Sequence, residues 1–250
     1  MEVDENNNSA SRARWILLNA SHEHHKKSVL EAWANVLSPD HGENIDHFEI
    51  VKLIQALRDE IKATKAEAEK CKIPTNLYEH HIDKALEATQ VENLTSQWIT
   101  YRQFITPDLL LCFSFCAFIF GVDEFSFDEE DIEEIQKLIS ELELQVDDGA
   151  IDPVLKHFVT TQIKTLKHSL NEYRIKGAKA FKSAYVNGVV QVFENEELIK
   201  GKTDLSEINL LRKVWEKMKM ATEKAASTNK AIDTWVKLIE KGSEVIEHLS

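Results

Sequence analysis

The chain has 250 residues, of which seven are glycine and four are proline, and 43% are hydrophobic. So few turn-forming residues disfavour β-sandwiches and barrels, in which each short strand needs its own turn. The formal net charge of −13 disfavours general binding to nucleic acid or to anionic membranes, because both attract a positive surface. The abundant helix-forming residues predict an all-α fold, a multi-helix bundle with long C-terminal helices.

The cysteines and the apolar runs indicate a cytoplasmic protein without a membrane span. Cys71, Cys112 and Cys116 are odd in number, and two of them lie in an apolar run, so we expect reduced thiols. Residues 1–11 are polar, lack a signal-peptide pattern and are predicted to be a disordered tail. The longest apolar run, 109–120, is shorter than the roughly 20 residues that a spanning helix needs.

Apolar residues at helical spacing predict an N-terminal helical domain over residues 12–122. Its first part, 12–37, is helical with a break near the histidines, and a long helix follows over 45–71. Asn76 with Glu79 three residues later predicts a capped helix that continues to about residue 88.

The last element of this domain is an aromatic helix over residues 107–121. Thr106 is the predicted N-cap of this helix, and Pro107 is its predicted first residue. Proline is favourable there because the N–H group of the first helical residue has no partner within the helix, so its absence costs nothing. The helix is apolar on all sides, and such a helix is either buried or an interface. We expect it to contribute to a core shared by both domains.

Residues 123–250 are predicted to form a C-terminal helical bundle. Ser126 with Glu129 resembles a capping box, Asp152 caps a second helix, and Gly177 interrupts it. Apolar residues at steps of three and four mark the buried faces: Ile132, Ile135, Ile139, Leu142 and Val146; Leu155, Val159, Ile163, Leu166, Leu170 and Tyr173; Phe181, Tyr185, Val189 and Val192.

The final segment, 204–249, has two interpretations. Its apolar steps of three and four are unbroken, which favours one helix of more than 40 residues. The small and polar residues in its middle favour instead a hairpin that turns near residues 227–229.

Charge is distributed unevenly within the bundle. Residues 123–148 hold twelve acidic residues and one lysine, whereas 152–182 hold seven basic and two acidic residues. Because the connection is short, we expect the two helices to be antiparallel neighbours whose charges face each other. Such pairs set register more than stability.

The histidines are the candidates for metal chemistry. His22 and His25 are three residues apart, as are His80 and Asp83, with His81 between them. Imidazole and carboxylate groups on one helix face can bind a transition metal, but two ligands make no site unless the two groups meet. We expect solvated histidines, and we assign no catalytic residue, cofactor or metal.

One stretch of the bundle resembles a known module. The acidic run SFDEEDIEEIQKLISELELQV begins at Ser126, and YRIKGA occupies 173–178. Together the residues of about 126–192 resemble a helical module of uncharacterised bacterial proteins that has no known activity. Proteins of this kind are sometimes encoded with mobile or anti-phage elements, so the resemblance implies a bacterial system of that sort.

Three functions remain open. The first is a non-enzymatic, cytosolic interaction or scaffold protein that self-associates or binds a protein partner, because long helices with apolar stripes need partners to cover them. The second is a metal-assisted enzyme that uses the histidines and carboxylates. The third is a membrane-associated effector that acts through 107–121. For the first, the predicted contacts are aromatic and aliphatic anchors: Trp215, Trp235, Phe118, Ile232 and Val236.

Overall fold

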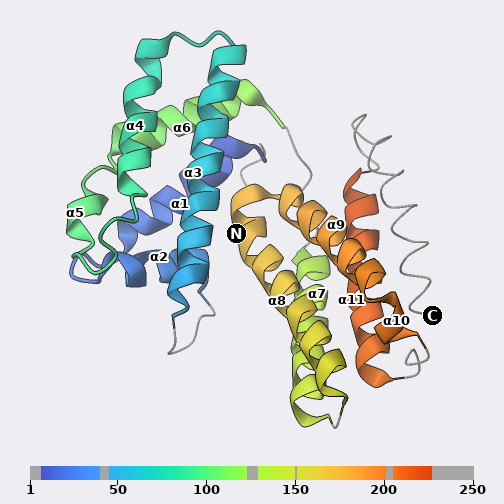
Figure 1. Cartoon of the computed structure of the whole chain (residues 1–250). Helices are drawn as coiled ribbons and strands as arrows, with labels where there is room; N and C mark the ends of the chain where they lie inside the picture. Colours follow the sequence, from blue (N-terminus) through green and yellow to red (C-terminus); the bar gives the residue numbers. More distant parts are fainter. Residues whose placement is uncertain (1–6, 40–44, 123–128, 150, 201–204, 227–250) are drawn as a thin grey trace. The chain divides into compact units, whose positions relative to one another are not determined.

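The computed structural model describes residues 7–39, 45–122, 129–149, 151–200 and 205–226 (Figure 1). In these ranges the chain forms helices and no β-strand, apart from one isolated bridge between Ser28 and Gln97. The prediction of an all-α fold is therefore confirmed. The chain divides into two compact units: residues 1–124 with 174–177, and residues 125–173 with 178–250.

Unit 1 is built around α1 and α3. Its elements are α1 (Ser9–His22), α2 (Val29–Leu37), α3 (His47–Lys70), the 3₁₀ turn η1 (Thr75–Leu77), α4 (Glu79–Ala88), α5 (Ile99–Arg102) and α6 (Pro107–Phe120). Helix α1 packs against α2, α3 and α6, and α4 packs against α3 and α6. Trp33 and Trp98 meet edge to face in this core, with ring centroids 5.2 Å apart.

The start of α1 differs from the predicted tail over residues 1–11. Asn8 caps α1, and the following Ser9 and Ser11 are buried in unit 1. The Asn8 side chain accepts the N–H of Ser11, and the Ser11 hydroxyl accepts the N–H of Asn8. These residues are polar because the first N–H groups of a helix need acceptors, and not because they face solvent.

The predicted cap at Asn76 is wrong, whereas the predicted helix over 45–71 is confirmed by α3. The N–H groups of Leu77 and Tyr78 bond back to the carbonyls of Pro74 and Thr75, so this segment forms a 3₁₀ turn. Helix α4 then begins at Glu79 without a side-chain cap.

Unit 2 contains the long helices of the C-terminal half: α7 (Glu129–Asp148), α8 (Pro153–Lys176), α9 (Ala178–Glu194), the short α10 (Glu196–Ile199) and α11 (Ser206–Ala226). The last residues of α8 group with unit 1. Helix α11 packs against α7 and α9. The core of unit 2 consists largely of the predicted stripes, including Ile135, Leu142, Val159 and Phe181.

The predicted boundaries of α8 are confirmed. The Asp152 carboxylate accepts the N–H groups of Val154 and Leu155, and Gly177 separates α8 from α9. Gly177 has φ +62°, a left-handed conformation that glycine adopts without steric cost. The predicted cap at Ser126 and the choice between one helix and a hairpin over 227–229 lie outside the described residues.

Ion pairs connect the acidic helix α7 to two neighbours in unit 2. Lys167 of α8 pairs with Glu143, and Lys217 of α11 pairs with Asp131 at 3.0 Å and with Glu134. Hydrogen bonds to Glu134 and Asp131 raise the pKa of Lys217. The acids of α7 thus face basic side chains of α11 as well as of α8.

Helices α9 and α11 approach each other closely at Gly188 and Trp215. The side chain of Trp215 is buried and meets Tyr185 edge to face, with ring centroids 6.0 Å apart. Its indole ring also lies where a Cβ atom of residue 188 would be, so only glycine fits at Gly188. Trp215 and Gly188 therefore hold α9 and α11 together as a matched pair.

We expect Gly188→Ala to destabilise unit 2, although alanine favours helices by up to about 1 kcal/mol over glycine. The added methyl group overlaps the Trp215 ring, and overpacking of this kind costs about 1–3 kcal/mol. Urea unfolding, with hydrogen exchange of α9 and α11, measures the loss. The control is Asn187→Ala at the exposed neighbouring position. A urea midpoint for Gly188→Ala that equals or exceeds that of the original chain would contradict the close contact between residue 188 and Trp215.

Candidate functional site

Helix α6 is apolar around its whole circumference, yet only one side of it is buried. That side packs on α1, α3 and α4 in unit 1. Its buried residues are Leu109, Cys112, Phe113, Cys116 and Ala117. The sequence predicted a helix shared by both cores, whereas these residues belong to the core of unit 1.

The opposite side of α6 is exposed, and from Leu111 onward its large side chains are apolar. Leu111, Phe115 and Phe118 follow one another at steps of four and three residues, and they are 68%, 45% and 78% exposed. Ile119 and Val122 are also exposed. We call these five residues the α6 apolar face. A contiguous exposed apolar patch, unlike scattered single residues, marks a binding surface.

Both ends of α6 are fixed by side-chain hydrogen bonds. The Thr106 hydroxyl accepts the N–H of Leu109 at 3.3 Å, which confirms the predicted cap. At the other end, the Asn8 amide donates to the carbonyls of Ala117 at 2.9 Å and Gly121 at 2.7 Å. Because Asn8 also caps α1, one buried side chain joins the start of α1 to the end of α6.

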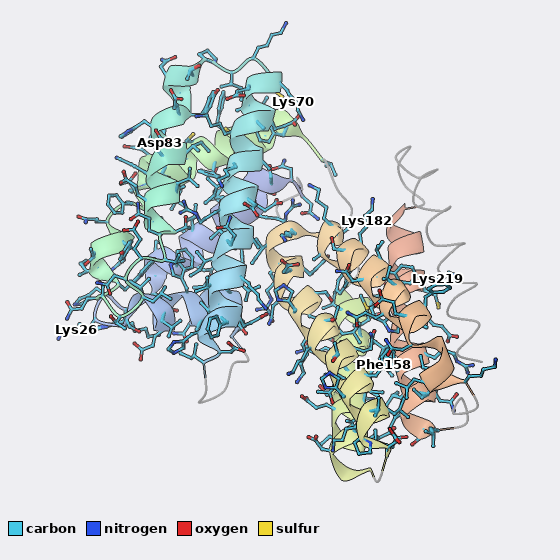
Figure 2. All side chains as sticks on the ribbon, viewed as in Figure 1. Lys26, Lys70, Asp83, Phe158, Lys182 and Lys219 are labelled. Carbon is cyan, nitrogen blue, oxygen red and sulfur yellow. The ribbon has the colours of Figure 1, made fainter. Side chains whose placement is uncertain are left out.

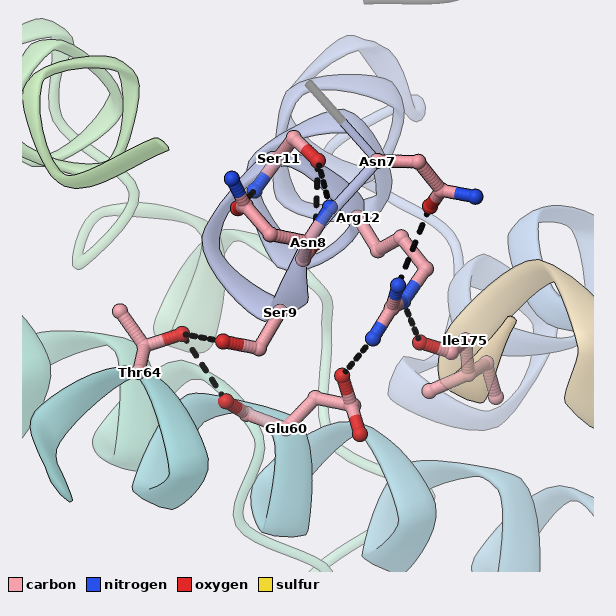
Figure 3. Close-up of polar contacts among 8 residues, drawn as sticks. All are labelled: Asn7, Asn8, Ser9, Ser11, Arg12, Glu60, Thr64 and Ile175. Atoms are coloured by element: carbon pink, nitrogen blue, oxygen red, sulfur yellow. Dashed lines mark hydrogen bonds and ion pairs between the residues drawn. The ribbon is translucent and has the colours of Figure 1, made fainter. Parts of the chain in front are cut away.

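A polar cluster surrounds this junction (Figure 3). Arg12 lies at its centre, forms an ion pair of 2.6 Å with Glu60 and donates to the carbonyl of Ile175 at 2.9 Å. Its guanidinium also donates to Asn7, while Thr64 donates to the carbonyl of Glu60. Arg12 and Glu60 are both buried, so each charge compensates part of the cost of burying the other. The cluster positions α1 on α3, and we assign it no chemistry.

The two thiols of α6 lie one turn apart on its buried side. A hydrogen bond between them lowers the pKa of Cys112 and raises that of Cys116, and burial raises the pKa of Cys116 further. The Cys112 thiol also contacts the carbonyl of Leu77 at 3.4 Å. Both are free cysteines that fill the core, in the manner of small hydrophobic residues.

The structure does not gather the candidate histidine ligands into a metal site. His22 ends α1 and His25 lies in the connection to α2, whereas His80, His81 and Asp83 belong to α4, where Asp83 is labelled in Figure 2. Within the ranges described above, no group of three or more His, Cys, Asp or Glu side chains could hold a metal ion. Burial lowers the pKa of His81, aided by His80 and Lys84 and opposed by Asp108.

The predicted interface residues have different surroundings. Phe118 lies on the α6 apolar face, whereas Trp215 is 1% exposed and packs inside unit 2. Trp215 is therefore not part of an exposed surface. Trp235, Ile232 and Val236 lie outside the described residues. Sequence reasoning missed Leu111 and Phe115, because a helix that is apolar on every side gives no signal of which side is buried.

We expect Glu60→Gln to destabilise unit 1 by about 3–5 kcal/mol, because it removes the charge of one member of a buried ion pair with Arg12. Urea unfolding, followed by hydrogen exchange of α1 and α3, measures the change. Glu79→Gln breaks the more exposed pair with Lys65 and serves as the control, with a much smaller expected effect. Equal losses for both variants would contradict the importance of the buried pair.

We expect the imidazole of His81 to titrate below the ordinary histidine range in an NMR pH series, because burial disfavours its charged form. The imidazole of His81 then binds its proton more tightly in the unfolded chain than in the folded protein. The contribution of His81 to stability is therefore present above about pH 6.5, the pKa of an unperturbed histidine, and it is lost as the pH falls through the pKa of His81 in the folded protein. His81→Gln should remove this part of the pH dependence. A pKa of His81 in or above the ordinary histidine range would contradict the prediction that burial disfavours its charged form.

Comparisons with known proteins give no relative. No protein-family model matches the chain. No curated protein and no solved structure matches it either. Within the described ranges, none of the helices combines the length and hydrophobicity that crossing a bilayer requires. The α6 apolar face is therefore the feature that indicates a function.

Proposed function

We propose that this chain is a non-enzymatic, cytosolic helical interaction protein that binds a protein partner through the α6 apolar face. One observation carries the proposal: three large apolar side chains, Leu111, Phe115 and Phe118, lie exposed in one row on a helix whose other side is firmly packed. Their steps of four and three residues are those of the anchors that one helix presents to another. The bacterial setting implied by the sequence resemblance belongs to this proposal.

The rigidity of α6 supports a binding role. Its two ends are held by Thr106 and Asn8, and its buried side is packed against three helices of unit 1. A surface that is already ordered loses little conformational entropy when a partner binds. Phe118 and Phe115 have large aromatic side chains. Side chains of this kind often contribute most of the binding energy of an interface, because each buries a large area.

A membrane-associated effector is the second candidate, because the same exposed aromatic side chains could insert into a lipid surface. The net charge of −13 works against anionic lipids. Flotation with phosphatidylcholine vesicles tests it directly: the chain should not float. Flotation that is lost in a Leu111→Asn/Phe118→Asn double variant would favour the membrane function over the protein partner.

The test of the interaction function replaces Phe118 with the photoreactive residue p-benzoylphenylalanine in cells that produce the chain. We expect light to produce adducts with another polypeptide at this position. Phe48, 83% exposed and also in unit 1, is replaced in the same way as the matched control and should give far fewer adducts. The adduct mass shows whether the partner is a second copy.

Two results would contradict the proposed function. One is an equal yield of adducts at Phe118 and Phe48, which would mean that the α6 apolar face is an ordinary surface. The other is an adduct at Phe118 that lies within the same chain, since the face would then be covered internally.

A further inference from the structure

The two thiols of α6 form a contacting pair that the α6 apolar face does not use. Cys112 and Cys116 are one turn apart on the buried side of α6, opposite that face. A hydrogen bond joins the two thiols, so their sulfur atoms lie in contact. Such a pair has a chemistry that a single buried cysteine lacks, because both sulfur atoms can bind one metal ion.

The pair lies beside a part of unit 1 that reaches the surface. The sulfur of Cys112 contacts the carbonyl of Leu77 at 3.4 Å, and Leu77, in the 3₁₀ turn η1, is exposed. Cys116 lies one turn further along α6 and is more completely buried than Cys112. Cys112 is therefore the thiol nearer to solvent.

The helical spacing of the two cysteines disfavours a disulfide between them. Cβ atoms four residues apart on a helix are about 5–6 Å from each other, whereas a disulfide needs Cβ atoms about 3.5–4.5 Å apart. Thr106 and Asn8 hold the two ends of α6, and three helices pack on its buried side. An intact α6 therefore keeps both thiols reduced.

The same spacing suits a metal ion that two sulfur atoms bind from opposite sides. Two metal–sulfur bonds of about 2.3 Å, placed end to end, hold the sulfur atoms about 4.6 Å apart. Cβ atoms about 5–6 Å apart allow this span. In the described part of the chain, no third His, Cys, Asp or Glu side chain completes a larger site. Structural zinc and iron–sulfur clusters take four ligands, so copper(I) remains among the metals that thiolates select.

The charge of the pair also suits a monovalent ion. The hydrogen bond from the Cys116 thiol favours the thiolate of Cys112, so the singly deprotonated pair holds one proton and one negative charge. Copper(I) carries the same charge as the proton that it replaces. The S–H bond of Cys116 breaks, two copper–sulfur bonds form and the proton passes to solvent, with no change in the buried charge.

We propose that Cys112 and Cys116 together bind one copper(I) ion between their sulfur atoms, as a two-coordinate site on the buried side of α6. This site goes beyond the proposed function and does not depend on it. The bound ion links two successive turns of α6 and so stabilises the helix that carries the α6 apolar face.

The experiment offers copper(I), without oxygen, to the reduced full chain in competition with bicinchoninate, a coloured chelator of copper(I). We expect the chain to remove one copper ion per molecule from the chelator. X-ray absorption of the copper-loaded chain should then count two sulfur ligands on each ion. This count uses the original chain and therefore needs no variant.

Variants show which cysteines bind the ion. Cys112→Ala and Cys116→Ala each leave one sulfur ligand, so each should weaken copper binding at least about a hundredfold through loss of the second attachment. The matched control is Cys71→Ala at the exposed third cysteine, which should leave the affinity unchanged. Circular dichroism and urea unfolding check that each variant is folded.

Three results would overturn the inference. The first is a chain that removes no copper from the chelator. The second is a loss of affinity in Cys71→Ala as large as in Cys112→Ala, which would make the exposed cysteine the ligand. The third is an absorption spectrum with one sulfur ligand on each ion, and this result decides the matter even if an alanine variant does not fold.

Discussion

The fully buried amide of Asn8 determines where α6 lies in unit 1. Its oxygen accepts an N–H at the start of α1, and its nitrogen donates to two carbonyls at the end of α6. These are the backbone groups that helix ends leave without partners, and burying them unpaired would cost free energy. The position of α6 on α1 in turn decides which of its apolar side chains enter the core and which form the α6 apolar face.

The two units are stabilised in different ways. Unit 1 places polar groups inside its core, with Arg12, Glu60, Thr64 and Ser9 forming contacts between α1 and α3. Unit 2 follows apolar stripes, and its ion pairs, such as that between Lys217 and Asp131, lie between helices nearer its surface. A buried network specifies one arrangement because each member needs its partner, whereas stripes specify mainly which face is inside.

This difference explains what could be predicted from sequence. The stripes of α7, α8 and α9 and the caps at Thr106 and Asp152 are local patterns with one interpretation, and the structure confirms them. Asn8 and Ser11 looked like part of a tail because a polar cap and a solvated residue have the same composition. The exposed side of α6 was hidden by its uniform hydrophobicity. Its identity depends on contacts with α1, α3 and α4 that are distant in sequence.

The contact between Gly188 and Trp215 also constrains how this protein can change during evolution. The indole occupies the space of the missing side chain, so neither position can vary by itself without a loss of packing. A homologue with a larger residue at 188 is expected to carry a smaller one at 215. In an alignment of related chains these two columns should therefore covary, and the pair would locate the α9–α11 contact in homologues whose structures are not known.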